Sequence, residues 1–413
     1  MDGLPVTPGW YGADPADPEY LYDPHPALRH LREEHPVNLT PQGHWRLTRY
    51  RDVHRLLHGV PAGMRTSSGR LPGQSEEEAV LNPAAFMLLQ DPPAHTRLRK
   101  LVSKAFTPRA VESWRPRVET ITEQLLDAVA DRGSMDLIAD LALPVPSTLI
   151  CELMGIPVSD RDTFTSWTTD ATHGLATSRN MATPEVEQRV AEAGAALVNY
   201  FSRLFEERRG DLGDDLLSVL IAAEEEGDRL SESELLAQSI GLLIAGFETT
   251  IGLIGNGLTE LIRHPDEIAK LRERPELIES TVEECLRFAG PIAMTVRVLQ
   301  DDVDFGGVTI PRDAQVFAVL AAANRDPEQF EDPERFDVER YAREPRPPAH
   351  FSFGGGTHHC LGAHLARMES QVAIGNLVRR FDRLALVNER TEWGRSLFRV
   401  PARVPVTFRA RRG

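Results

Sequence analysis

Cysteine is scarce in this chain of 413 residues, which contains only Cys151, Cys285 and Cys360. Three widely separated cysteines form no disulfide framework, so we expect a protein of the reducing cytoplasm. The absence of a Cys-x-x-Cys pair also argues against a zinc site. Cys151 lies in an apolar run and Cys285 in the middle of a predicted helix, and both are predicted to be packed core thiols.

Basic residues are outnumbered, with 46 Lys and Arg against 62 Asp and Glu and a formal net charge of −16. That balance argues against nucleic acid binding, which needs a basic surface. The first 34 residues are polar and rich in proline, so we expect neither a signal peptide nor a membrane anchor. The sequence lacks the Gly-x-Gly-x-x-Gly motif that would indicate a flavin or nicotinamide domain.

No flexible linker, repeat or low-complexity segment interrupts the sequence. We therefore predict one large domain over residues 1–413, mainly α with small β-sheets. Residues 1–49 read as coil, a helix and a hairpin. Helical periodicity dominates from Pro92 to about Arg287, and strands are expected between Val296 and Val319 and again at Val404–Phe408.

A glycine-rich stretch from Phe353 to Gly362 surrounds Cys360. Glycines allow close backbone approach and turns that a Cβ would forbid. A predicted helix follows at once, so that residues 351–380 form a loop and a helix. The N–H groups and positive dipole end of that helix favour a thiolate. This pattern suits the presentation of a lone thiolate to a flat cofactor.

A long helix is predicted over residues 231–263, starting at the capping-box sequence Ser231-Glu232-Ser233-Glu234. Its middle contains Ala245-Gly246 followed by Glu248-Thr249. Small residues leave room beside the helix, and a threonine hydroxyl can bond a backbone carbonyl and open the helix locally. An acid coupled to a positioned hydroxyl suits proton delivery. If the motif stood alone, a capped or solvent-facing Glu-Thr pair would be the favoured interpretation.

Both stretches resemble motifs of the cytochrome P-450 monooxygenases. The first matches Phe-Gly-x-Gly-x-(His or Arg)-x-Cys-x-Gly, and the second matches (Ala or Gly)-Gly-x-(Asp or Glu)-Thr-Thr. The resemblance implies the cytochrome P-450 fold and a haem b whose axial ligand is the Cys360 thiolate. It also implies a haem-binding loop containing Phe353, Gly354, His358 and Gly362. In the helix it implies that Ala245 and Gly246 line the oxygen groove, that Gly246 makes room for dioxygen, that Thr249 hydrogen-bonds the activated oxygen and that Glu248 relays protons.

Further residues receive roles from the same resemblance. Donors to the two haem propionates are expected at His95, Arg99, Arg297 and His358. Glu284 and Arg287 match Glu-x-x-Arg, and Arg335 of Pro333-Glu334-Arg335-Phe336 is expected to complete a buried, structural ion network with them.

The predicted function is that of a soluble bacterial-type monooxygenase that inserts one oxygen atom from O2 into an apolar organic substrate, most simply by C–H hydroxylation. Electrons are expected from separate partners such as a ferredoxin and its reductase. The basic residues Lys100, Lys104 and Arg109 either dock such a donor or form a solvated face. We expect a monomer. Substrate-contacting segments are expected at residues 63–89, 172–181, 242–246, 292–296 and 396–398.

Three alternatives remain at this point. A peroxide-driven enzyme is disfavoured because Glu248-Thr249 is intact. An oxidative coupling or ring-forming enzyme is not excluded by any residue. A non-catalytic haem sensor or carrier is disfavoured by the complete proton relay.

Overall fold

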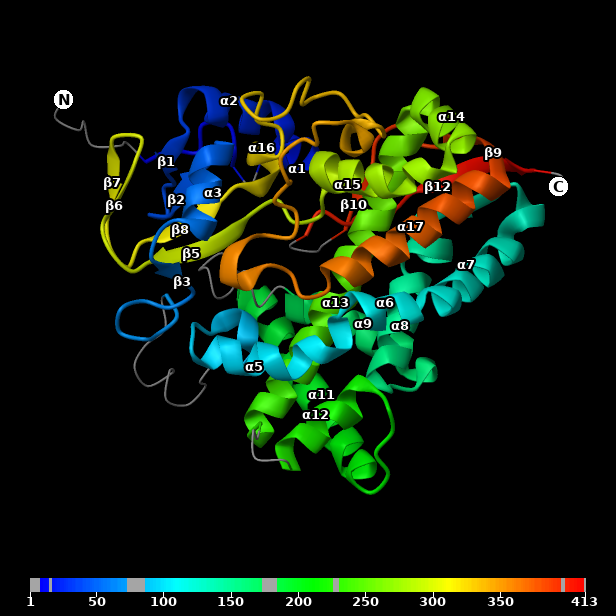
Figure 1. The fold of residues 1–413 in the computed structure, drawn as a ribbon, viewed down its shortest axis with the longest axis horizontal. Helices are drawn as coiled ribbons and strands as arrows, with labels where there is room; N and C mark the ends of the chain where they lie inside the picture. Colours follow the sequence, from blue (N-terminus) through cyan, green and yellow to red (C-terminus); the bar gives the residue numbers. More distant parts are fainter. Residues whose placement is uncertain are drawn as a thin grey trace. The chain divides into compact units, whose positions relative to one another are not determined.

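The computed structural model describes residues 8–14, 17–72, 86–172, 184–225, 230–394 and 398–411. Helices account for most of the described chain, and the strands form small sheets (Figure 1). The fold class is therefore mainly α with small β-sheets, as the sequence predicts.

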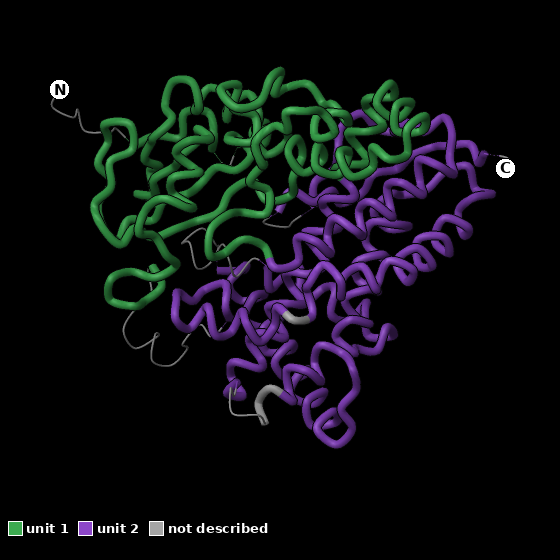
Figure 2. The backbone as a smooth tube through the Cα atoms, in the orientation of Figure 1, with its two compact units in different colours: residues 1–72, 256–360 green, residues 73–255, 361–413 purple. Residues whose placement is uncertain are grey.

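The chain forms two compact units, each assembled from two separate segments (Figure 2). Unit 1 contains residues 1–72 and 256–360, and unit 2 contains residues 73–255 and 361–413. One boundary falls inside a continuous helix and another directly after Cys360. At these two boundaries the chain continues without a linker, which agrees with the lack of a compositional break there.

Unit 1 contains a five-stranded sheet in the order β1-β2-β8-β5-β3. Strands β2 and β8 are parallel, and the other neighbours are antiparallel. A second, two-stranded sheet joins β6 and β7. The strands of unit 1 are β1 (Val37–Leu39), β2 (Trp45–Leu47), β3 (Ala62–Gly63), β5 (Thr295–Leu299), β6 (Val303–Phe305), β7 (Val308–Ile310) and β8 (Gln315–Ala318). The helices are α1 (Pro18–Tyr22), α2 (His25–Glu34), α3 (Tyr50–His58), α14 (Pro265–Glu273), α15 (Ile278–Ala289) and α16 (Leu320–Ala323).

Apolar residues of this sheet, buried in consecutive positions of β2, β5 and β8, build the core of unit 1. Leu47, Leu299 and Val316 are fully buried and pack with Leu56 of α3. The apolar face of α3 therefore rests on the sheet, which holds α3 in a defined place.

Unit 2 is built mainly of helices with two small antiparallel sheets, β4-β12-β9 and β10-β11. Helix α17 packs along α7 (Figure 1). The helices of unit 2 are α5 (Ala94–Ser103), α6 (Pro108–Ser113), α7 (Arg115–Val129), α8 (Pro144–Met154), α9 (Arg161–Thr172), α11 (Pro184–Arg209), α12 (Leu216–Glu225) and α17 (Ala363–Arg380). The strands are β4 (Ser134–Asp136), β9 (Phe381–Leu386), β10 (Glu392–Trp393), β11 (Pro401–Arg403) and β12 (Pro405–Ala410).

Helix α13 (Glu232–Arg263) is 32 residues long, and most of it belongs to unit 2. A capping box starts it: the Ser231 N–H donates to Glu234 Oε2 at 2.8 Å, and the Glu234 N–H donates to Ser231 Oγ at 3.2 Å. Among the described residues α13 is the one helix long and apolar enough to cross a membrane, and 67% of its most apolar window is buried. Such burial is typical of a core helix.

Glycines let neighbours approach α13 closely. A Cβ on Gly241 would lie 2.3 Å from the ring of Phe86, and a Cβ on Gly255 would lie 2.6 Å from Ile138. Both distances are far below van der Waals contact, so these positions admit no side chain without a shift of the neighbour.

Candidate active site

Cys360 is the exposed cysteine of the three. Burial raises the pKa of the Cys151 thiol to about 12 and that of Cys285 well above its ordinary value. Both buried residues therefore remain protonated thiols at neutral pH. Cys360 ends a turn in which its own N–H donates to the Phe353 carbonyl at 2.9 Å. The accessible sulfur is thus held on a hydrogen-bonded loop.

The glycines before Cys360 let this loop sit against α3. Gly356 has a φ of +64°, and a Cβ there would lie 2.1 Å from the Leu57 carbonyl oxygen. A Cβ on Gly355 would lie 2.5 Å from Nε2 of His58. A side chain at Gly356 would meet the backbone of α3 and force the loop away from it, whereas one at Gly355 would first meet the His58 side chain.

Asn324 and Ser352 fasten the start of the loop to α15. The side chain of Asn324 accepts from the Phe351 N–H at 2.7 Å and donates to Ser352 Oγ at 3.0 Å. Ser352 Oγ in turn donates to the Leu286 carbonyl at 2.6 Å. These buried bonds give the loop a fixed anchor.

Glu284 and Arg287 of α15 form a bidentate ion pair with N–O distances of 2.7 and 2.8 Å, and neither side chain is exposed. Arg287 also donates to the Asn324 carbonyl at 3.0 Å. The pair is therefore connected, through Asn324, to the loop that carries Cys360.

The third member of this network is Arg340, which corrects the prediction for Arg335. Arg340 Nε lies 3.1 and 3.2 Å from the two carboxylate oxygens of Glu284. Arg335 is exposed and contributes its backbone carbonyl, which accepts from Arg287 at 3.2 Å and from Arg340 at 3.0 Å. The Pro333–Phe336 segment contacts the pair through this backbone carbonyl, and the arginine that reaches Glu284 comes five residues later in the chain.

Two of the expected propionate donors lie in unit 1. Arg297 of β5 is buried, and its guanidinium donates to the Val296 carbonyl at 2.8 Å and to the Gly355 carbonyl at 3.4 Å. Arg297 therefore contacts the Cys360 loop itself. His358, two residues before the cysteine, is half-buried.

The other two expected donors, His95 and Arg99, lie one turn apart on α5 in unit 2. His95 is 2% exposed and Arg99 is half-buried. Arg97, between them, forms an ion pair with Glu234 in the first turn of α13. That pair joins α5 to α13.

The middle of α13 leaves one face accessible. Ala245 is exposed and Thr249, one turn later, is half-buried, whereas Leu243 and Phe247 are buried. Thr249 Oγ1 donates to the Ala245 carbonyl at 2.9 Å, the back-bond that its position in a helix predicts. The small residue and the hydroxyl together leave space and a polar group on one face.

Gly246 does not face this open side. A Cβ at that position would lie 2.8 Å from Cδ1 of Ile150 in α8. The structure thus gives this glycine a helix-packing role, and its predicted role in making room for dioxygen stays a prediction.

Glu248 is 4% exposed, and its Oε2 lies 2.6 Å from the hydroxyl of Thr172. Of the predicted substrate-contacting segments, residues 73–85, 173–181 and 396–397 lie outside the described residues. The stretch Ile292-Ala293-Met294 is half-buried and apolar.

Sequence reasoning missed Asn324, Arg325, Ser352 and Arg340. A signal existed for the first two, because the polar run Asn324-Arg325-Asp326 directly follows the apolar run Leu320–Ala323. Arg325 stacks 3.8 Å from the Phe288 ring centroid and pairs with Glu334 at 2.6 Å. No local pattern indicated Arg340.

Comparisons with known proteins agree on one family. The model of the family described as Cytochrome P450 matches residues 47–393. The chain is 43% identical over 387 residues to "Cytochrome P450 107B1" of Saccharopolyspora erythraea, covering 90% of each chain. It is 41% identical to "Vitamin D(3) 25-hydroxylase" of Pseudonocardia autotrophica, covering 94% of each. A crystal structure of P450BioI with a hexadec-9Z-enoic acid-ligated acyl carrier protein matches with a TM-score of 0.85 and 37% identity, covering 94% of this chain and 100% of that one.

The chain therefore belongs to the cytochrome P450 family. It is a monooxygenase whose cofactor is haem b with an axial cysteine thiolate, and it requires molecular oxygen and redox partners. The residues present fit that cofactor. Cys360 is an accessible sulfur on a glycine-rich loop, whereas the other two thiols are buried and protonated.

Proposed function

We propose that the protein hydroxylates a C–H bond of an apolar organic molecule, with Cys360 as the thiolate ligand of its haem. The observation that carries this proposal is the exposed Cys360 sulfur on a loop that is anchored to the buried Glu284–Arg287 pair. The thiolate-bound haem supplies the chemistry that activates dioxygen and inserts one oxygen atom.

The other residues have supporting tasks in this proposal. His95, Arg99, Arg297 and His358 bind the propionates, for which cationic and hydrogen-bonding donors are the natural partners. Thr249 presents a hydroxyl on the accessible face of α13, and Glu248 holds and passes on the protons that water formation consumes. Phe353, Gly354 and Gly362 shape the loop.

For the substrate we propose a largely hydrocarbon molecule such as a fatty acid, steroid, terpenoid or polyketide. The half-buried Ile292, Ala293 and Met294 offer apolar contact without fixed charge. The names of two relatives support this class, since one is a vitamin D(3) hydroxylase and the other was solved with a fatty-acyl carrier protein.

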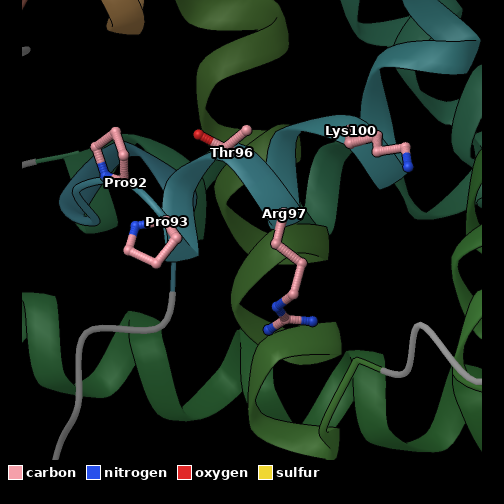
Figure 3. A pocket seen from close by; sticks show the side chains of 5 residues that line it. All are labelled: Pro92, Pro93, Thr96, Arg97 and Lys100. Carbon is pink, nitrogen blue, oxygen red and sulfur yellow. The ribbon is translucent and has the colours of Figure 1, made fainter.

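We also propose that a ferredoxin, reduced by its reductase, delivers the electrons to a cytoplasmic, monomeric enzyme. Lys100 and Arg109 are exposed, and Lys100 borders a pocket of about 610 Å³ at the start of α5 (Figure 3). In a chain of net charge −16 this local positive charge suits an acidic donor.

The test is the absorption spectrum of the dithionite-reduced holoprotein with carbon monoxide. We expect a strongly red-shifted Soret band, its loss in Cys360→Ser, and its retention in the matched Cys151→Ser. A band typical of histidine-ligated haem, or a red-shifted band that survives Cys360→Ser, would contradict the assignment.

A further inference from the structure

The carboxyl group of Glu248 in α13 meets the hydroxyl of Thr172 in α9. The distance from Thr172 Oγ1 to Glu248 Oε2 is 2.6 Å. The two residues are 76 positions apart in sequence, and Thr172 is completely buried. A contact this short between buried groups is a direct hydrogen bond with no intervening water.

Packing between the two helices holds this contact in place. Phe164 of α9 and Phe247 of α13 are both buried, and their rings meet edge to face with centroids 6.4 Å apart. Helix α9 also packs against α11, where Asp170 pairs with Arg189 at 3.5 Å. The last residue of α9 is therefore fixed beside Glu248 by contacts that involve neither the acid nor Thr172.

The contacts of Thr172 differ from those of three other threonines in α9. The hydroxyls of Thr165, Thr168 and Thr169 bond backbone carbonyls of their own helix. The Thr172 hydroxyl lies 2.8 Å from the Thr168 carbonyl in the same way, and it also reaches Glu248.

A hydroxyl has one proton to donate and can also accept. When Glu248 is ionised, Thr172 can donate its proton to the carboxylate. When Glu248 is protonated, the carboxyl O–H can donate to Thr172 Oγ1, and Thr172 can donate to the Thr168 carbonyl. A rotation of one hydroxyl therefore provides a hydrogen bond to the acid in both protonation states. A buried acid that gains and loses a proton needs such a partner, because an unmet buried group costs free energy in either state.

We infer that Thr172 is the positioning residue for Glu248: its hydroxyl keeps the carboxyl group in one place while that group gains and loses a proton. This inference rests on the proposed proton-relay role of Glu248. Thr172 neither transfers a net proton nor touches substrate in this scheme.

The experiment compares Thr172→Val, Thr172→Ser and the matched control Thr169→Val in the holoprotein. Valine keeps the branched shape and removes the hydroxyl, and serine restores it. Thr169 belongs to the same helix, and its hydroxyl donates only to the Thr165 carbonyl in the described contacts. The first readout is the infrared band of the Glu248 side chain, assigned by its loss in Glu248→Gln. The second is product formed per electron pair consumed, with hydrogen peroxide release and the spin-state Kd for substrate measured in parallel.

We expect Thr172→Val to shift the Glu248 band and to lower product per electron pair by about tenfold, the fold change that loss of one hydrogen bond to a charged group implies. Substrate Kd should be unchanged. Thr172→Ser should restore both readouts, and Thr169→Val should alter neither.

The inference would be overturned if the Glu248 band is unshifted in Thr172→Val, or if it shifts equally in Thr169→Val. This holds even if Glu248→Gln loses coupling, a result that would uphold the proton relay. Conversely, full coupling in Glu248→Gln would refute the relay itself, whatever Thr172→Val does to the band.

Discussion

The hydroxyl of Thr249 donates to the Ala245 carbonyl, so the group proposed for oxygen chemistry also takes part in the helix that presents it. Such a back-bond is weak and can be exchanged for another acceptor without breaking the helix. This suits a hydroxyl that must turn towards a bound molecule and back.

Replacement of Thr249 tests this role. We expect Thr249→Ala to lower product per electron pair by about tenfold, less than the ~10²–10⁴ of a complete acid or base because Glu248 remains. Hydrogen peroxide should account for the missing product. The measurement compares reductant use with product in a surrogate ferredoxin system. The neighbouring Thr250→Ala, which loses a buried hydroxyl 3.4 Å from the Gly246 carbonyl, should stay coupled. Coupling equal in the two variants would show that protons take another route.

Glu369 of α17 is another buried acid, 2% exposed, and within the described part of the structure its Oε2 has no hydrogen-bond partner. Burial raises its pKa well above the ordinary value of 4.5. The folded protein therefore keeps this proton at pH values where the unfolded chain has lost it. Stability is lost as pH rises above about 4.5 and approaches the raised pKa.

Replacement of Glu369 by glutamine tests this pH dependence. Glutamine does not ionise in the unfolded chain, so the variant avoids this pH-dependent loss. Its free energy of unfolding relative to the parent should rise by up to about 1.4 kcal/mol per pH unit above pH 5. Urea unfolding at pH 5 and pH 8 with matched haem loading measures this difference. The exposed Glu119→Gln should show no such trend, and a constant difference for Glu369→Gln would mean that Glu369 is ionised in the folded protein.

At the scale of elements, α15 is the anchor of the loop that carries Cys360. Its Glu284–Arg287 pair binds the segment after α16 through Asn324 and the segment around residue 340 through Arg340. A buried pair of this kind contributes little net stability compared with apolar residues, but breaking it strands a charge. The role of the Glu284–Arg287 pair is therefore to hold the loop in a fixed position.

Arg340→Ala tests which arginine completes the network. We expect a loss of about 3 kcal/mol, the low end for a broken buried pair, because Arg287 still neutralises Glu284. Arg335→Ala is the matched control and should cost below about 0.5 kcal/mol, since its side chain is exposed. Chemical unfolding and the rate of haem loss provide the two measurements. Equal losses in both variants would disprove the assignment to Arg340.

At the scale of the whole molecule, the charge distribution affects how an electron donor approaches the protein. The net charge of −16 repels an acidic donor in general, so the proposed ferredoxin would have to approach local positive charge such as Lys100 and Arg109.

Charge-reversal variants at different salt concentrations test this proposed docking site. Lys100→Glu and Arg109→Glu should each raise the KM for an acidic ferredoxin severalfold and leave kcat at saturation nearly unchanged. The effect should fade at high salt, because the Debye length falls from ~10 Å at 0.1 M to ~3 Å at 1 M. Arg409→Glu, an equal change of charge at an exposed position of β12, is the control. A KM that responds equally to all three variants would indicate net charge and no docking site.

Features that depend on short-range spacing could be predicted from the sequence. Three such features are local: the glycine pattern around Cys360, the capping box of Ser231 and Glu234, and the i,i+3 pair of Glu284 and Arg287. The structure places α13 at Glu232–Arg263, within one residue of the predicted range 231–263. Backbone geometry makes such neighbours meet whatever the rest of the chain does.

Contacts between groups far apart in the sequence depend on how the elements pack and could not be predicted. Arg340 approaches Glu284 because an irregular segment turns it inward, and no period in the sequence records that turn. Thr172 meets Glu248 because the Phe164–Phe247 contact sets how α9 lies on α13. The missing side chain of Gly246 faces Ile150 because α8 lies there. Each of these depends on the packing of side chains between elements, which pattern and propensity do not encode.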